Sequence, residues 1–211
     1  GKIGGRLVLA LNGGVPNVQG DMAFGRLDLA STAQFILGAG VTTSDGEAWP
    51  EQPFAAASLF PVNFNLKINA DEADAGMIGQ IGKFQTSASF KDGSLRLDDT
   101  KGQILCGQLG GMFELRNTSG TGLARGQFTL DQTAIEALYR PEAGEPPLKG
   151  KARISASVNA TGTSLAEMVK SIAGSGVVSV NGLGINGLNP GALTPIMADV
   201  DAAQGPVTAA A

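Results

Sequence analysis

Alternating apolar and polar residues recur along this 211-residue chain and predict β-strands. The clearest run begins at Val62, after which Phe64, Leu66 and Ile68 alternate with asparagine and lysine. A period of two places successive side chains on opposite faces of a strand, so each run has one apolar and one polar face. The same pattern predicts further strands within residues 3–11, 20–30, 76–90, 93–97, 107–115 and 122–130.

Short turn signals separate several of these runs. Asn12-Gly13-Gly14 and Asp92-Gly93 are typical of tight hairpins, which join antiparallel neighbours. At Gly25-Arg26 the alternation slips by one residue, which predicts a β-bulge. Between residues 31 and 61 the alternation fails, and we expect a short helix over 29–37 followed by a long loop or a crossing at the edge of the sheet. Trp49 in that loop is expected to cap the open end of a core rather than to stack on a ligand.

Residues 148–188 predict a strand–helix–strand unit. The first strand alternates Ile154, Ala156, Val158 and Ala160 with hydroxyl and amide residues. Ser164 fits a helix N-cap, with Glu167 placed to bond back to the cap amide. We expect Gly174 to end that helix and a second strand to carry Val178 and Val180. The helix presents one apolar stripe that must be covered, formed by Leu165, Met168, Val169 and Ile172.

Two further helices are expected beside this unit. Asp131 can cap a short helix that presents Ile135, Leu138 and Tyr139. Near the end of the chain, a helix that begins either at Asn189-Pro190 or at Thr194-Pro195 presents Leu193, Ile196, Met197 and Val200. Because this last helix has no Lys or Arg, we expect it to close the end of the β-structure rather than to adsorb to a bilayer.

Composition excludes most catalytic chemistry. The chain has no histidine, which rules out histidine metal sites and Ser-His-Asp or Cys-His catalysis. The lone Cys106 is expected to be a buried, unreactive thiol. The net charge is −4 without a basic cluster, which argues against nucleic acid as a partner. The carboxylates of residues 71–74 and Asp98-Asp99 lack calcium-loop spacing, and the glycines of residues 182–187 lack the following helix that a dinucleotide site needs. We therefore expect a non-enzyme with no catalytic, cofactor or metal residues.

The fold class that these patterns indicate is mainly β with a few short helices. Hydrophobic residues make up 43% of the chain, and 31 glycines are spread along it, as many strands and tight turns require. Strands with one apolar face each can form a closed barrel, a sandwich, or a long sheet bent into an open trough. The residue pattern alone leaves these three open.

A resemblance to a known family narrows the choice. The run GKARISASVNATGTSLAEMVKSIAGSGVVSVNGLGINGLN resembles the C-terminal region of the AsmA family, whose phrasing of glycine and apolar positions it matches at Gly162, Ser164, Leu165, Gly174, Gly176, Gly182, Ile185 and Gly187. The upstream Gly93-Ser94-Leu95-Arg96-Leu97 run resembles the family's hairpin phrase. The looser CGQLGG of residues 106–111 departs from its usual glycine spacing.

The resemblance implies a fold and a role. AsmA-like proteins are similar to bridge-like lipid transfer proteins, whose β-sheets curl into a groove lined by aliphatic side chains. The expected fold is thus an antiparallel meander curled into a groove or an open barrel or sandwich, with helices closing one end. We expect one domain over 1–211, in which 1–130 form the meander and 131–211 the strand–helix–strand unit with its closing helix. The groove candidates are Val62, Phe64, Leu66, Ile68, Ile154 and Val158.

The resemblance also implies a place in the cell. The chain is expected to be a fragment of a Gram-negative protein that projects into the periplasm from an inner-membrane anchor lying upstream. Such a protein supports outer-membrane biogenesis by carrying phospholipid acyl chains along its groove. The alternative is a compact β-sandwich that serves as a structural or interaction domain in outer-membrane protein assembly without binding lipid itself.

Overall fold

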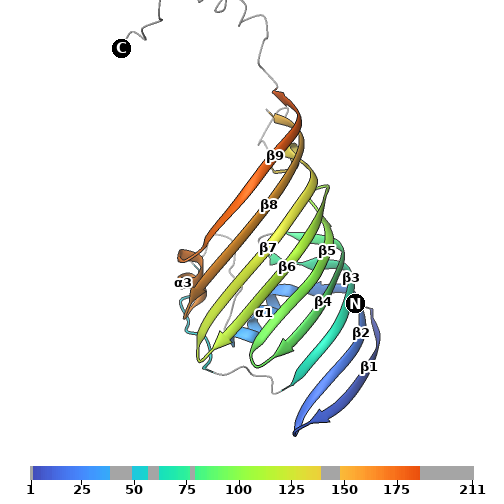
Figure 1. The fold of residues 1–211 in the computed structure, drawn as a ribbon, viewed down its shortest axis with the longest axis vertical. Helices are drawn as coiled ribbons and strands as arrows, with labels where there is room; N and C mark the ends of the chain where they lie inside the picture. The colour runs from blue at the N-terminus through green and yellow to red at the C-terminus, as the bar shows by residue number, and fades with distance from the viewer. Residues whose placement is uncertain (1, 39–48, 57–61, 77–78, 139–147, 186–211) are drawn as a thin grey trace, which may run out of the picture.

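The strands of the computed structural model form one sheet (Figure 1). The structure describes residues 2–38, 49–56, 62–76, 79–138 and 148–185. Within them, nine strands lie side by side in the order of the sequence. They are β1 (Ile3–Asn12), β2 (Val15–Asp28), β3 (Asn63–Asp74), β4 (Gln80–Lys91), β5 (Ser94–Ile104), β6 (Gly107–Thr118), β7 (Thr121–Ala134), β8 (Leu148–Gly162) and β9 (Ala173–Ile185).

The sheet is open and curled, as the fold-class prediction has it. It is mostly antiparallel and not closed into a barrel, and β1 and β9 form its two edges. The described strands belong to this single sheet, so of the three arrangements left open by the residue pattern the trough is the one observed. β2 and β3 pair in parallel, because the chain between them passes through α1 (Leu29–Leu37) and crosses back before β3 begins.

Tight turns with left-handed backbone join four of the hairpins, including β5 to β6, where Leu105 and Cys106 have φ of 50° and 59°. Gly13 and Gly14 have φ of 60° and 83°, and Asp92 and Gly93 have 50° and 75°. Positive φ at both central residues is the type I′ geometry that matches the twist of the flanking strands. The turns predicted at both places are confirmed. Ser119-Gly120, between β6 and β7, repeats the geometry with φ of 50° and 82°.

The register lines up the apolar faces of neighbouring strands. Each antiparallel pairing places residues of one face opposite residues of the same face, so the alternation predicted within single strands becomes rows across the sheet. One such row crosses β3 to β8 through Phe64, Phe90, Leu95, Leu115, Ala124 and Ala160. We call this apolar side the groove face and the opposite side the polar face.

A cover packs on one part of the groove face. It consists of α1, residues 49–56 and α3 (Leu165–Lys170), and its buried side chains include Leu37, Phe54 and Met168. Backbone hydrogen bonds join the three pieces, from the Ala55 N–H to the Leu37 carbonyl and from the Phe54 N–H to the Thr163 carbonyl. Figure 1 shows α1 behind the strands and α3 at one side of the sheet.

A second apolar cluster fills the other part of the groove face. Phe84 and Ile81 of β4 are buried there beside Ala70 and Ala73 of β3 and Ile104 of β5. The alternation shift predicted at Gly25 appears here, since Phe24 and Leu27 both pack against this cluster. The same shift occurs in β3, so the register of β2 with β3 continues without a slip.

The strand–helix–strand prediction is confirmed in outline and corrected in detail. Ser164 is the N-cap of α3, and its hydroxyl accepts a hydrogen bond from the Glu167 N–H at 3.3 Å. The Glu167 carboxylate, however, accepts from the N–H and hydroxyl of Thr163 rather than from the cap amide. The helix ends at Lys170 with Ser171 as its C-cap, so Gly174 does not end it and lies in β9.

Other predictions are corrected as well. Asp131 does not cap α2 (Ile135–Leu138), because it lies within β7, where its carboxylate pairs with Arg153. Cys106 is exposed, since it sits in the turn between β5 and β6, and the prediction of a buried thiol is therefore wrong. Ile172 follows α3 and is exposed. Strand β7 runs across the boundary drawn at residues 130/131, while the helix expected after residue 189 lies outside the described residues.

We expect Ser164→Ala to lower the free energy of unfolding by about 1 kcal/mol, because the first turn of α3 would lose its cap. Denaturant unfolding measures the change. Ser175→Ala, at an exposed hydroxyl of β9, is the matched control and should leave stability unchanged. Equal stability of the Ser164 and Ser175 variants would show that the cap does not hold the cover in place.

Candidate functional site

The predicted groove residues lie on the groove face. Phe64, Leu66 and Ile68 occupy successive groove-face positions of β3 and are half-buried. On β8, Val158 lies in the same cross-strand row as Leu66, and Phe113 of β6 is part of that row. Ile154, also on β8, lies one row further along the strands than the row that contains Ile68. Val62 directly precedes β3 and is half-buried. The structure thus brings five of the six residues to one surface, with Val62 at its margin.

Glycines widen the groove where β7, β8 and β9 meet. A β-carbon on Gly126 would lie 3.4 Å from a methyl of Val158 and 3.5 Å from the ring of Phe113. On β9, a β-carbon on Gly174 or Gly176 would press against backbone oxygens of β8. Because these positions carry no side chain, the backbone of the sheet is accessible there between the rows of aliphatic side chains.

Solvent reaches the groove face at the β1 edge, where Ile3, Leu7, Leu9 and Leu11 are 51–72% exposed, and over part of β6 to β9. Phe113 is 38% exposed and Val158 is 37% exposed, although both side chains are apolar and share a row. Val178 on β9 is 63% exposed, opposite the half-buried Ile154. The cover and the cluster around Phe84 occupy the groove face over β3 to β5, and they also pack against Leu115, Ala124 and Ala160 on β6 to β8. We call the exposed part around Phe113, Val158 and Val178 the open wall. It lies beside the packed part of the groove face.

Sequence reasoning missed part of this wall. The period-two pattern predicts strands at 107–115 and 122–130 but does not mark Phe113 and Phe128 as groove residues, and it assigns Val178 and Val180 only to a short strand. Their period-two spacing indicates that each lies on the apolar face of its strand. Only the register between strands shows that these faces are the same as the face of Val158.

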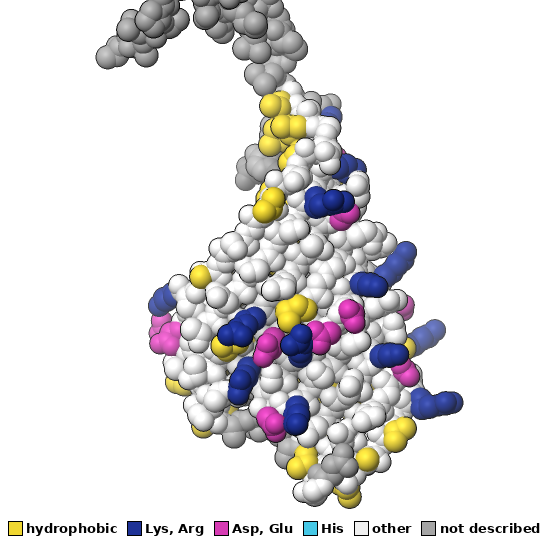
Figure 2. All heavy atoms as spheres, viewed as in Figure 1, with side chains coloured by type: hydrophobic (Ala, Val, Ile, Leu, Met, Phe, Trp, Pro, Cys, Tyr) yellow, Lys and Arg dark blue, Asp and Glu magenta, His cyan; other side chains and the backbone are white. Residues whose placement is uncertain are grey.

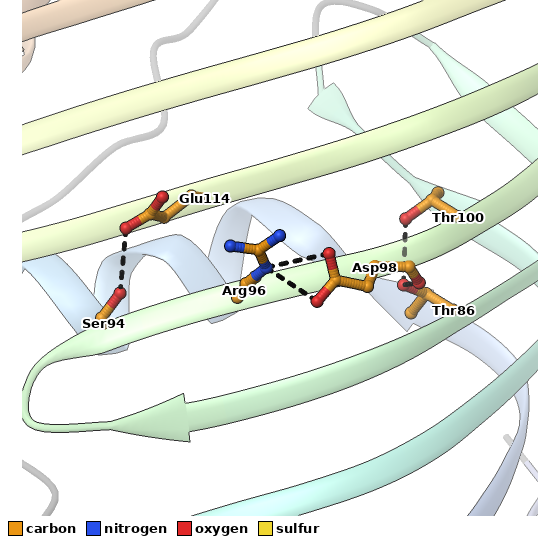
Figure 3. A network of polar contacts seen from close by, with 6 residues as sticks. All are labelled: Thr86, Ser94, Arg96, Asp98, Thr100 and Glu114. Atoms are coloured by element: carbon orange, nitrogen blue, oxygen red, sulfur yellow. Dashed lines mark hydrogen bonds and ion pairs between the residues drawn. The ribbon is translucent and has the colours of Figure 1, made fainter.

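Buried polar groups interrupt the groove face at Thr86, Asn117 and Thr133; among the described residues the Thr133 hydroxyl has no hydrogen-bond partner, whereas that of Thr86 has two. Thr86 is buried in the row after Ala88, and its hydroxyl lies 2.9 Å from that of Thr100 and donates to the Asp98 carbonyl at 3.0 Å (Figure 3). Asp99 beside it has φ of 51° where the β4–β5 register shifts. The extra residue brings the two hydroxyls together, so the apolar row contains no unmet donor at this point.

At the regular positions of the strands, charged side chains lie on the polar face. Figure 2 shows this face, with cationic and anionic groups intermingled on a surface of small polar residues. Arg96 donates to both carboxylate oxygens of Asp98, at 2.9 and 2.7 Å, and this hydrogen bonding raises the pKa of Arg96 (Figure 3). The hydrogen bond from Arg153 lowers the pKa of Asp131 in the same way. Such exposed pairs keep the face soluble and contribute little to stability.

Two shallow hollows lie on the polar face. The larger has a volume of about 790 Å³ and the smaller about 570 Å³. Met112, Gln127, Ser157 and Ser175 border both, and these are side chains of the polar face. Groove-face positions also border them, Phe128 at the larger hollow and Val158 at the smaller.

The described residues contain no group of three or more Cys, Asp or Glu side chains that could hold a metal ion. None of the described helices has the length and apolar character that a membrane span requires. Comparison of the chain with known protein families, with curated proteins and with solved structures finds no match. The argument about function therefore rests on the two faces of the sheet.

Asn117 ties the cover to the sheet. Its side chain is only 7% exposed, and its amide donates to the Ala55 carbonyl at 2.9 Å and, over longer distances, to the carbonyls of Ile36 and Leu37. Its side-chain oxygen accepts from the Gly120 N–H at 3.1 Å. One amide at the end of β6 thus satisfies backbone groups of α1, of residues 49–56 and of the turn after β6.

We expect Asn117→Ala to lower the free energy of unfolding by about 2 kcal/mol, because buried carbonyls of the cover would lose their donor. Loss of the cover also exposes Phe90 and Leu95, so binding of a hydrophobic dye should rise. Asn65→Ala, on the polar face of β3, is the control and should change neither measurement. Normal stability of the Asn117 variant would mean that packing alone holds the cover.

Proposed function

We propose that this protein binds acyl chains of phospholipids along its groove face and carries them without a chemical step. The observation that carries the proposal is the continuity of one apolar face across the sheet, part of it open to solvent. Rows of aliphatic residues and phenylalanine run from β3 to β9, while the opposite face bears the charges. Soluble proteins rarely leave such a surface uncovered unless it has an occupant.

The energetics favour a chain-like ligand. Each CH₂ group removed from water is worth about 0.8 kcal/mol, so an acyl chain gains from every row that it contacts. Eight inter-strand spacings of about 4.8 Å give the groove face a length of about 38 Å across the strands. The open wall offers aliphatic groups and glycine backbone but few polar groups, so it favours no single position along the chain. A ligand that slides is better suited to this surface than one held in a fixed pose.

The cellular role follows from the resemblance described above and is part of the same proposal. In it, the chain forms part of a periplasmic protein anchored in the inner membrane of a Gram-negative bacterium and supports outer-membrane biogenesis. The pattern of glycine and apolar residues in β8, α3 and β9 supports this proposal. So does the curled, open sheet, since a groove that conducts lipid needs an uncovered apolar face.

The test uses Val158→Glu, which places a carboxylate on the open wall. Because Val158 is already 37% exposed, the charge remains hydrated and the fold should persist. We expect the variant to lose at least about tenfold in acyl-chain binding, since a carboxylate beside the chain forfeits the burial of two or more CH₂ groups at about 0.8 kcal/mol each. Photo-crosslinking to a phospholipid with a diazirine in its acyl chain measures the loss.

Ser157→Glu is the matched control, because it adds the same charge one residue away on the polar face. It should crosslink like the unaltered protein, and circular dichroism checks that both variants fold. Mass spectrometry of organic extracts from the purified protein identifies the bound lipid. If both variants crosslink equally, or the extracts contain no lipid, the groove is a structural surface and the interaction-domain alternative stands.

A further inference from the structure

The free edge of β9 is an unprotected strand edge. All of the chain from Ala173 to Ile185 is without charge and without proline, and nearly every residue of it is exposed. Among the described residues no strand or helix pairs with the side of β9 that faces away from β8. Native sheets usually protect such an edge with charge, proline, a bulge or a covering segment. The regular part of β9 has none of these protections among the described residues. This points to another strand that pairs with its free edge.

The hairpin geometry shows which residues of β9 present free backbone groups. In a two-residue hairpin the residues beside the turn form a hydrogen-bonded pair, and bonded and non-bonded pairs then alternate along and across the sheet. Thr118 and Thr121 flank such a turn on the polar face of β6 and β7. The groove-face pairs are therefore non-bonded between β6 and β7, hydrogen-bonded between β7 and β8, and non-bonded again between β8 and β9. Groove-face residues of β9 therefore aim their N–H and C=O groups at the free edge.

We propose that a second copy of this chain occupies that edge, with the two β9 strands paired antiparallel about a two-fold axis at Val177. In this register every groove-face pair joins a glycine to a valine, since Gly174 lies opposite Val180 and Gly176 opposite Val178. The polar-face pairs are Ser175 with Ser179 and Val177 with itself. On the groove face each valine therefore packs beside a glycine, and on the polar face residues of equal size meet. The groove faces of the two copies lie on the same side of the joined sheet, so the apolar surface continues from one copy into the other.

The register explains why this pairing is preferred over the alternatives. The other edge strand, β1, carries Arg6 on its polar face, so two β1 strands paired antiparallel would bring like charges onto neighbouring positions. Beyond Val180 the edge becomes irregular, because Gly182 has φ of 63° and the β8–β9 register shifts there. The four regular groove-face positions are thus all used by the proposed pairing. A two-fold contact also closes on itself and yields a dimer rather than a fibre.

The decisive variants are Val177→Lys and Val177→Glu. Val177 is 67% exposed on the polar face, so either charge is tolerated in the single chain. In the dimer the two copies of residue 177 would form a non-bonded pair with α-carbons about 4.5 Å apart, where like charges repel. Light scattering after gel filtration of lipid-free protein should give twice the 21.3-kDa chain mass for the unaltered protein and once that mass for each variant.

Mixing the two variants provides the specific readout. Lysine opposite glutamate restores the pairing only if residue 177 lies opposite itself, so the mixture should return to twice the chain mass. Val8→Lys is the control, because it adds a charge at an exposed polar-face position of β1 and should leave the dimer intact. If the Val177 variants fail to fold, Ser175→Lys combined with Ser179→Lys places two like-charged pairs at the same contact and should give the same loss.

Three outcomes would overturn the proposal. A monomeric unaltered protein at its highest soluble concentration rules out the contact. A dimer that persists in Val177→Lys, or one that is lost in Val8→Lys, places the interface elsewhere. A mixture that stays monomeric shows that the two-fold axis does not pass through Val177. Lipid binding by the groove is measured separately, so the failure of either proposal leaves the other intact.

Discussion

The fold depends on keeping one face of every strand apolar and in line with its neighbours. A slip of one residue would turn the apolar set of a strand toward solvent, so the register must hold from β1 to β9. Type I′ turns at Gly13-Gly14, Asp92-Gly93, Leu105-Cys106 and Ser119-Gly120 set that register where hairpins are short. Where it must change, the sheet uses local shifts, as between β4 and β5, where the displaced threonine hydroxyls bond to each other.

An open sheet cannot bury its apolar face by itself, and the protein meets this constraint in two ways. The cover, fastened by Asn117, buries part of the groove face, and the cluster around Phe84 buries another part. Around Phe113, Val158 and Val178 neither is present, and these side chains remain accessible. Under the proposed function, the packed regions would hold the curl of the sheet while the open wall receives the acyl chain.

The same open architecture leaves two strand edges. A sheet that lengthens by adding strands at its edge extends the groove face at the same time, since groove-face rows continue from strand to strand. Pairing between copies and acyl-chain binding would then use the two components of one surface, backbone groups at the edge and side chains on the face. Neither requires an acid, a base or a metal, which agrees with a chain that has no histidine.

The sequence by itself determined the local features of this protein. Period-two alternation is a property of single strands, so the strands around Phe64 and Ile154, the short helix at 29–37 and the Ser164 cap could be predicted from neighbouring residues. Contacts between distant residues decided the rest. The parallel pairing of β2 with β3, the Asp131–Arg153 pair, the exposure of Cys106 and the joining of Phe113 to Val158 all depend on which strands meet and in which register. Alternation allows a barrel, a sandwich or a trough equally, and only the tertiary structure chose the trough, because that choice lies in hydrogen bonds between strands rather than within them.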